Sequence, residues 1–117
     1  MLFPKQDFKQ FSAYGSYGID PTALEGREVK SLTIDSLDVQ DHISFMKVNI
    51  QGSDLAALRG AKETIMRHKM PIIFEFEQQF QDSFQTCFHD YVSFVNEISY
   101  RFDKVVMDIN YLILLKN

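Results

Sequence analysis

Hydrophobic and polar residues alternate in two stretches of the first half of the chain. The first, Val29–Ile34, has the period of two that predicts a β-strand, and it ends at Asp35. The second, Ser44–Ile50, has the same period and is closed by Gln51-Gly52. We therefore expect two consecutive strands in this part of the chain.

Apolar residues then follow at the spacing of a helix. Ser53 is a suitable N-cap, and the apolar positions after it predict one helix over residues 54–68. Pro71 ends this helix, and an apolar run over residues 72–76 follows. So short a run between two helices is typical of a strand that is buried on both faces of a parallel sheet.

A longer apolar stripe occupies residues 84–102. It predicts a core-facing helix whose apolar members are Phe84, Phe88, Tyr91, Val92, Val95, Ile98 and Phe102. Two strands, Lys104–Asp108 and Tyr111–Leu115, close the chain, and they must pair antiparallel because a parallel pair needs a long crossover. The order β, β, α, β, α, β, β predicts an α/β fold with a mostly parallel sheet and a C-terminal antiparallel hairpin.

Residues 1–28 differ from the rest, and we expect an aromatic-rich N-terminal arm ahead of one α/β domain at 29–117. Aromatic rings recur every three positions, at Phe8, Phe11, Tyr14 and Tyr17, and turn residues crowd the second half. The rings either pack on a neighbouring surface or form a stacking ladder for bases or sugars. If the rings form a stacking ladder, the chain would be a small-ligand or sugar-binding module.

Composition narrows the classes of protein. The chain has 117 residues, which is room for one domain, and its formal net charge of −4 argues against binding to nucleic acid. The single cysteine, Cys87, excludes an intramolecular disulfide and a cysteine-rich zinc site. No apolar run approaches the roughly 20 residues of a membrane helix, and the first residues lack the apolar core of a signal peptide. We therefore expect a cytoplasmic protein that does not bind membranes.

The glycines exclude the usual nucleotide cradle. They stand at Gly15, Gly18, Gly26, Gly52 and Gly60, and no two are separated by a single residue. A G-x-G-x-x-G turn is therefore impossible in this sequence, and so is the phosphate-binding pattern G-x-x-x-x-G-K-[ST].

Polar residues stand where three of the expected strands end. Asp35 ends the first strand, Asn49 and Gln51 end the second, and Glu75 lies at the end of the third. Ligands of open parallel sheets bind beyond these carboxyl ends, where an acid can bind a metal, act as a base or hold a hydroxyl group. The alternative is that these acids are solvated or cap the next turn. None of the three histidines pairs with another at H-x-x-x-H spacing, so we expect no metal site.

The stretch around residues 30–76 contains three motifs in succession. It reads V-K-S-L-T-I-D-S-L, then I-S-F-M-K-V-N-I-Q-G-S-D-L-A-A-L-R-G-A-K-E-T-I, then P-I-I-F-E-F. These motifs resemble those of the FkbM-type methyltransferase family, which carries T-L-D-x-L, then L-K-I-D-V-E-G-A-E-x-x-V-L-x-G-A, then P-x-I-x-x-E. The resemblance implies a Rossmann-like fold, S-adenosylmethionine as the cofactor, and O-methylation of small hydroxylated molecules.

The same resemblance assigns the site residues. Asp35 falls on the acid of T-L-D and becomes a cofactor-binding candidate, whereas Glu75 falls on the acid after the proline and becomes a catalytic one. Asn49 and Gln51 stand where the family has Asp and Glu, so they are catalytic candidates by position that have lost their charge. A neutral amide neither accepts a proton nor holds a cation as a carboxylate does. Asp54 in place of the family's Glu is a milder change.

The family's first strands, with their glycine turn and ribose-binding acid, have no counterpart in this sequence. We therefore expect the C-terminal half of a methyltransferase fold, which would bind the cofactor poorly by itself. One edge of its sheet would be uncovered, so we expect a partner there, either a second copy or another chain, unless residues 1–20 fold over it. Either methyl transfer depends on that partner, or the chain is a non-catalytic relic or interaction module that retains the half-fold.

Overall fold

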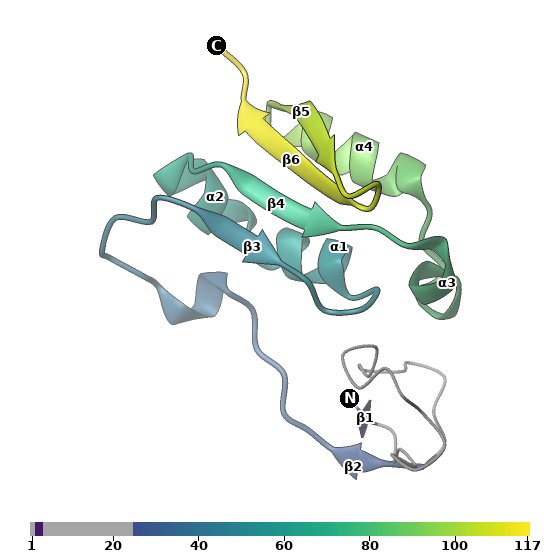
Figure 1. Ribbon diagram of the computed structural model, residues 1–117. Coiled ribbons are helices and arrows are strands. Elements are labelled where there is room, and N and C mark those ends of the chain that lie inside the picture. Colours follow the sequence, from purple (N-terminus) through teal and green to yellow (C-terminus); the bar gives the residue numbers. More distant parts are fainter. Residues whose placement is uncertain (1, 4–24) are drawn as a thin grey trace.

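The computed structural model describes residues 2–3 and 25–117 (Figure 1). The expected aromatic arm at residues 1–28, with its expected folding over a sheet edge, lies largely outside these residues. The elements in chain order are β1 (Leu2–Phe3), β2 (Arg27–Glu28), the 3-10 helix η2 (Asp35–Leu37), β3 (Met46–Val48), α1 (Asp54–Arg59), α2 (Lys62–His68), β4 (Ile72–Glu75), α3 (Gln78–Gln81), the 3-10 helix η3 (Asp82–Phe84), α4 (Phe88–Glu97), β5 (Tyr100–Val106) and β6 (Asn110–Leu115).

The main sheet has four strands in the order β3-β4-β6-β5, and β1 pairs with β2 separately. β3 and β4 are parallel, whereas β6 is antiparallel to both β4 and β5. The fold is thus α/β with a C-terminal antiparallel hairpin, as expected, but the prediction of a mostly parallel sheet is wrong. β3, β4 and β5 point the same way, but the last strand, β6, runs in the opposite direction and lies between β4 and β5. Only β3 and β4 are therefore parallel neighbours.

The strand expected at Val29–Ile34 does not form. Within the described part of the chain no strand lies beside these residues, and Leu32 is 66% exposed. The segment instead turns into η2, where the Ser36 N–H donates to the Thr33 carbonyl at 3.2 Å. Alternation alone does not make a strand, because a strand needs a neighbour for its backbone hydrogen bonds.

The single helix expected over residues 54–68 is two helices, α1 and α2. In a continuous helix the Thr64 N–H would donate to the Gly60 carbonyl. That carbonyl instead accepts the Asp35 N–H at 2.8 Å, and the Thr64 N–H donates to the Asp35 carboxylate at 2.8 Å. Asp35 therefore bonds to both groups that would form the missing helical hydrogen bond, the Gly60 carbonyl and the Thr64 N–H. This explains why the helix breaks at this point.

The long helix expected over residues 84–102 is shorter, because α4 covers only Phe88–Glu97. Its start is set by a capping box in which the Cys87 N–H donates to the Asp90 carboxylate at 2.8 Å. Its end is set by Ser99, whose φ of 61° leaves the helical region. The apolar stripe is nevertheless where the sequence placed it, since Tyr91, Val95 and Ile98 are buried.

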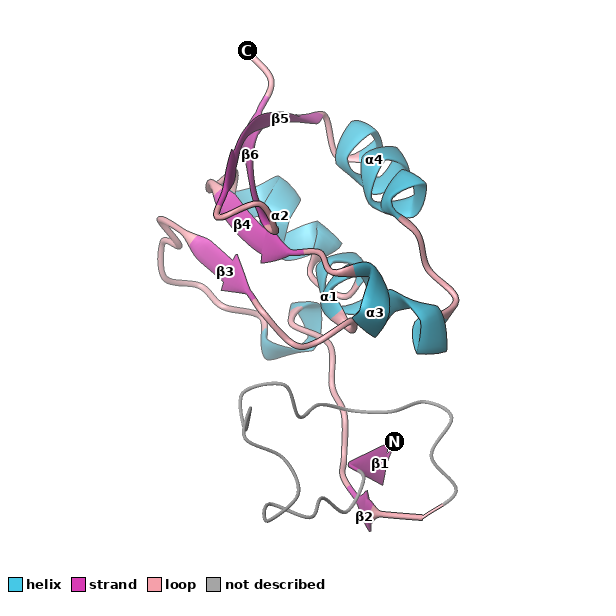
Figure 2. Ribbon diagram, turned by 45° about the vertical axis from the view of Figure 1, so that its right-hand side comes forward, coloured by secondary structure: helices cyan, strands magenta, loops and turns pink. Residues whose placement is uncertain are grey.

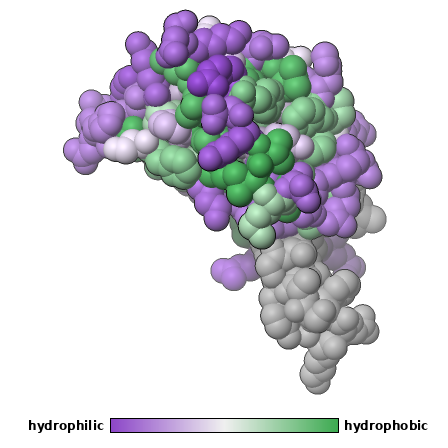
Figure 3. Space-filling view, turned by 45° about the horizontal axis from the view of Figure 1, so that its top comes forward, coloured by the Kyte–Doolittle hydropathy of each residue, from purple (hydrophilic) through white to green (hydrophobic). Residues whose placement is uncertain are grey.

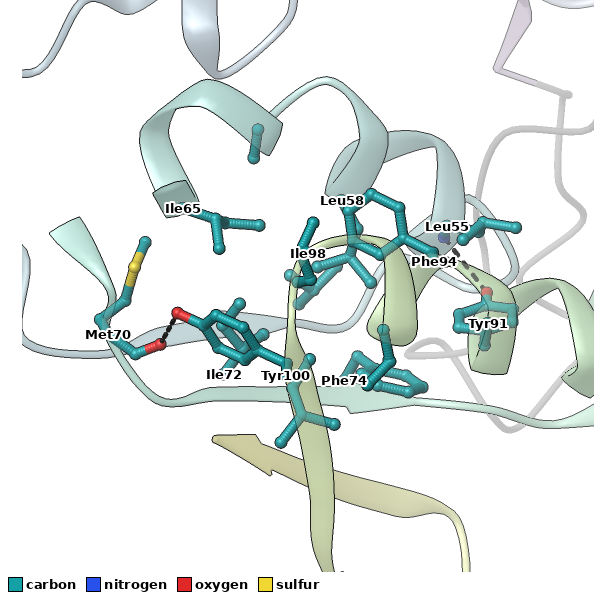
Figure 4. Close-up of a cluster of buried hydrophobic side chains, with 14 residues drawn as sticks. Leu55, Leu58, Ile65, Met70, Ile72, Phe74, Tyr91, Phe94, Ile98 and Tyr100 are labelled. Carbon is teal, nitrogen blue, oxygen red and sulfur yellow. Dashed lines mark hydrogen bonds between the residues drawn. The ribbon is translucent and has the colours of Figure 1, made fainter. Parts of the chain in front are cut away.

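The helices α1, α2 and α4 lie on one face of the main sheet (Figure 2), and the core fills the space between them. Two tyrosines anchor this core with their hydroxyl groups (Figure 4). Tyr100 donates to the Met70 carbonyl at 2.8 Å, and the Tyr91 oxygen accepts the Leu55 N–H at 3.2 Å. Among the described residues, no helix has both the length and the apolarity that crossing a membrane requires.

The strand β4 is not buried on both faces as expected. Ile72 and Phe74 are buried beneath the helices, whereas Ile73 and Glu75 on the other face are only half-buried. The helices that cover β4 all lie on the same side of it, so its second face is left partly open.

Candidate functional site

The carboxyl ends of β3 and β4 bring Asn49 and Glu75 together. The two strands are parallel and Val48 pairs with Phe74, so the next residue of each strand lies beside the other. The Asn49 amide lies close enough to the Glu75 carboxylate to favour its charged form. Partial burial raises the pKa of Glu75 and the charge of Glu77 raises it further, whereas Asn49 and the charge of Lys47 lower it only in part. The site therefore holds a carboxylate whose proton affinity is increased.

Gln51 completes this group from the loop after β3. Its side-chain nitrogen donates to the Asn49 side-chain oxygen at 3.3 Å, and its φ of 53° turns the backbone toward α1. The structure thus brings together Asn49, Gln51 and Glu75, the three catalytic candidates of the sequence. The Oε1 atom of Gln51 and the Oγ atom of Ser53 are buried and have no hydrogen-bond partner. Two polar atoms without partners in one loop suit a ligand that carries N–H or O–H groups.

Asp54 lies directly beneath this loop and is fully buried, at 0% exposure. Its carboxylate accepts the Ile50 N–H at 3.2 Å and the Glu75 N–H at 3.3 Å, so it ties the end of β3 to the end of β4. Burial raises the pKa of Asp54 to about 6, even though these hydrogen bonds favour the charged form. From the sequence, Asp54 was singled out only as a replacement for the family's Glu.

A second buried group supports the same loop from α4. The Tyr91 hydroxyl donates to the Gln81 side-chain oxygen at 3.1 Å and accepts the first-turn N–H of Leu55. Burial, together with the charge of Asp54, raises the pKa of Tyr91 to about 12. Neither Gln81 nor the polar role of Tyr91 was found from the sequence, where Tyr91 counted only as a member of an apolar stripe.

Asp35 faces a different part of the molecule. Its carboxylate accepts the N–H of Glu63 at 3.1 Å, the N–H of Thr64 at 2.8 Å and the Thr64 hydroxyl at 2.7 Å. Slight burial raises the pKa of Asp35, but these hydrogen bonds outweigh it and the net pKa is lowered. Asp35 caps α2, and its role in cofactor binding stays a prediction.

Replacing Asp35 by alanine should lower the free energy of unfolding by about 2 kcal/mol, since α2 loses the acceptor of its first N–H groups. Urea denaturation measures this loss. Asp41→Ala is the matched control, because Asp41 is an exposed loop residue, and it should change stability by about 0.5 kcal/mol or less. Equal losses in the two variants would show that Asp35 does not cap the helix.

The remaining chemical candidates have ordinary structural contacts. Within residues 2–3 and 25–117, no three His, Cys, Asp or Glu side chains are grouped so as to hold a metal ion. The His68 Nδ1 atom accepts the Ile43 N–H at 3.3 Å, which leaves Nε2 to donate to the Val39 carbonyl at 3.1 Å. Cys87 is exposed and caps α4.

Comparison with known proteins gives one family match. The family described as the methyltransferase FkbM domain matches residues 3–102, a stretch that contains the whole site and ends within β5. No curated protein and no solved structure matches the chain.

Proposed function

Because the chain belongs to the FkbM methyltransferase family, we propose that it forms the substrate side of an S-adenosylmethionine-dependent O-methyltransferase for small hydroxylated molecules. The observation that carries this proposal is the meeting of Asn49, Gln51 and Glu75 at the carboxyl ends of two parallel strands. Ligands of α/β sheets bind at such an edge.

The side chains of the site suit a hydroxylated ligand. Asn49 and Gln51 offer amide groups that can orient a hydroxyl, and the unpartnered oxygen atoms of Gln51 and Ser53 can accept hydrogen bonds from it. Glu75, with its raised pKa, is the candidate to take the hydroxyl proton. S-adenosylmethionine would supply the methyl group.

We further propose that the four-stranded sheet is one half of a Rossmann-like methyltransferase sheet. In support, β3, β4 and β5 point the same way and the reversed strand β6 lies between β4 and β5. The glycines of this sequence form no dinucleotide-type turn. The proposal therefore assigns cofactor binding to residues outside this sequence, next to the outer edge of β3. It also places a partner, either a second copy or another chain, along that edge.

A calorimetric titration tests this division of roles. We expect the purified chain to show no saturable binding of S-adenosylmethionine up to about 1 mM, a limit that corresponds to roughly 4 kcal/mol of binding free energy. S-adenosylhomocysteine serves as the second probe. Saturable binding in the micromolar range would place the cofactor site within this chain and overturn the division.

The double variant Asn49→Asp and Gln51→Glu restores the family's carboxylates and tests the site itself. The pKa of Glu75 should rise, because the Asn49 amide, which favours the charged form of Glu75, is replaced by a negative charge. NMR titration of the glutamate side chains measures this change, and the single variant Gln51→Glu separates the two positions. An unchanged pKa of Glu75 in the double variant would show that position 49 does not act on it.

A second candidate function is a non-catalytic interaction module. The amides of Asn49 and Gln51 favour it, because they bond to each other where the family has two acids. If the restored double variant gains no methyl transfer when a cofactor-binding half is supplied, the interaction module becomes the better description.

A further inference from the structure

The main sheet has a second face that carries none of the described helices. Figures 1 and 2 show α1, α2 and α4 on the opposite side. The pairing register defines this open face, since residues that pair across strands point to the same side. Its central row contains Lys47, Ile73, Leu112 and Lys104, one residue from each strand.

The middle of the open face is apolar. Ile73 and Leu112 lie on the two inner strands, and Leu114 follows Leu112 on the same side of β6. All three are half-buried by their neighbours in the sheet. A sheet face that meets only water normally alternates to polar residues, whereas β4 and β6 are apolar on both sides. This pattern indicates that the open face is built to be covered.

Two lysines flank the apolar centre. Lys47 on β3 and Lys104 on β5 are exposed, and each stands at an outer end of the central row. Three strand spacings separate them, or about 14 Å, which slightly exceeds the diameter of an α-helix. In Figure 3 hydrophobic residues occupy part of the middle of the surface, with hydrophilic residues both between and around them. Glu75 lies one row toward the carboxyl end of β4, close enough to Lys47 for the charge of Lys47 to lower the pKa of Glu75. Arg101 also lies on this face and is paired with Asp103 at 2.9 Å.

We propose that the open face binds an amphipathic helix of a partner protein, with its apolar stripe on Ile73 and Leu112. Acidic residues on both sides of that stripe would then pair with Lys47 and Lys104, which lie at the matching separation. This interaction does not depend on the proposed methyl transfer, because it uses the face of the sheet and not the ends of its strands.

Two other occupants fit the open face less well. A second copy placed face to face about a two-fold axis would bring lysine over lysine, since the central row has a positive charge at each end. A lipid surface would be contacted first by the exposed lysines, while the apolar side chains between them are half-buried and do not protrude. A helix with acidic flanks can pair with both lysines and also cover the apolar side chains between them.

Binding of a synthetic amphipathic peptide tests this proposal. The probe is a helical peptide with leucines at i, i+3, i+4 and i+7 and glutamates on both flanks, and the comparison peptide has lysines in place of the glutamates. We expect the glutamate peptide to bind more tightly, and the variant Lys47→Glu/Lys104→Glu to weaken it by about tenfold and to prefer the lysine peptide. The control Lys30→Glu/Lys69→Glu makes the same change in net charge at exposed lysines elsewhere and should bind as the original chain does.

Three results would overturn the proposal. One is equal binding of the two peptides, and another is equal weakening by both lysine variants. The third is binding to anionic phospholipid vesicles that depends on Lys47 and Lys104 while neither peptide binds, which would assign the face to a membrane. Amide chemical shifts that change on β4 and β6 when the glutamate peptide is added would support it directly.

Discussion

Replacing Gly52 by alanine should lower the free energy of unfolding by about 4 kcal/mol, the largest effect that we expect from one methyl group in this chain. Gly52 has a φ of 97°, where residues with a side chain are strained. A Cβ atom there would also lie 2.2 Å from the Phe80 carbonyl oxygen and 2.9 Å from the Phe84 ring. The substitution therefore has to push α3 and η3 away from the loop after β3.

Urea denaturation of Gly52→Ala measures this effect, and Gly60→Ala is the matched control. Gly60 has a φ of −73°, and a Cβ atom there would lie 3.2 Å from the Thr33 side chain. The expected change at Gly60 is below about 1 kcal/mol, because the helical preference of alanine offsets the tight contact. A Gly52→Ala protein that loses less than its Gly60→Ala control would contradict the close approach of Phe80.

The stability of the protein should fall as the pH rises from about 4 to about 6, because Asp54 has to lose its proton inside the core. Its pKa is 3.8 in the unfolded chain and about 6 in the fold. The folded state thus binds more protons within this window, and the free energy of unfolding decreases by about 3 kcal/mol across it. Below the window both states are protonated, and above it both are ionised, so the slope is confined to this range.

Urea denaturation in steps between pH 4 and pH 7 checks this dependence against the variant Asp54→Asn. The variant lacks one acceptor for the N–H groups of Ile50 and Glu75, so it should be less stable than the original chain at pH 4. The difference in the free energy of unfolding should shrink toward pH 7, because only the original chain then has an ionised carboxylate in its core. The control Asp41→Asn, at an exposed loop residue, should keep the slope of the original chain. A constant difference between the original chain and Asp54→Asn would show that Asp54 ionises as easily as in water.

The raised pKa of Glu75 acts in the same direction as that of Asp54, whereas the lowered pKa values of Asp35 and Asp90 act in the opposite direction. All three remain in the variant and in the control. The difference between the original chain and Asp54→Asn therefore reports the ionisation of Asp54 together with its charge interaction with Glu75.

The candidate site shows which features could be predicted from the sequence and which could not. Asn49, Gln51 and Glu75 were expected to meet because they follow two strands with one intervening helix, and such strands run parallel. The buried supports of the site were not expected. Asp54 and Gln81 have the polar character of surface residues, and only their partners on other elements make their burial tolerable.

The sequence by itself determined where apolar stripes and alternating runs lie, and therefore the positions of β3, β4 and β6, together with the polar residues at the strand ends. It misplaced β5, which covers Tyr100–Val106, whereas a helix was expected up to residue 102 and a strand at Lys104–Asp108. The tertiary structure alone decided that β6 inserts between β4 and β5, that Val29–Ile34 forms no strand, and that Asp35 divides one expected helix into two. The physical reason is that periodicity states which side of an element faces the core but not which element it meets. Asp35 accepts hydrogen bonds from Glu63 and Thr64, which lie 28 and 29 positions further along the chain. Groups so far apart in the sequence meet only when the chain has folded.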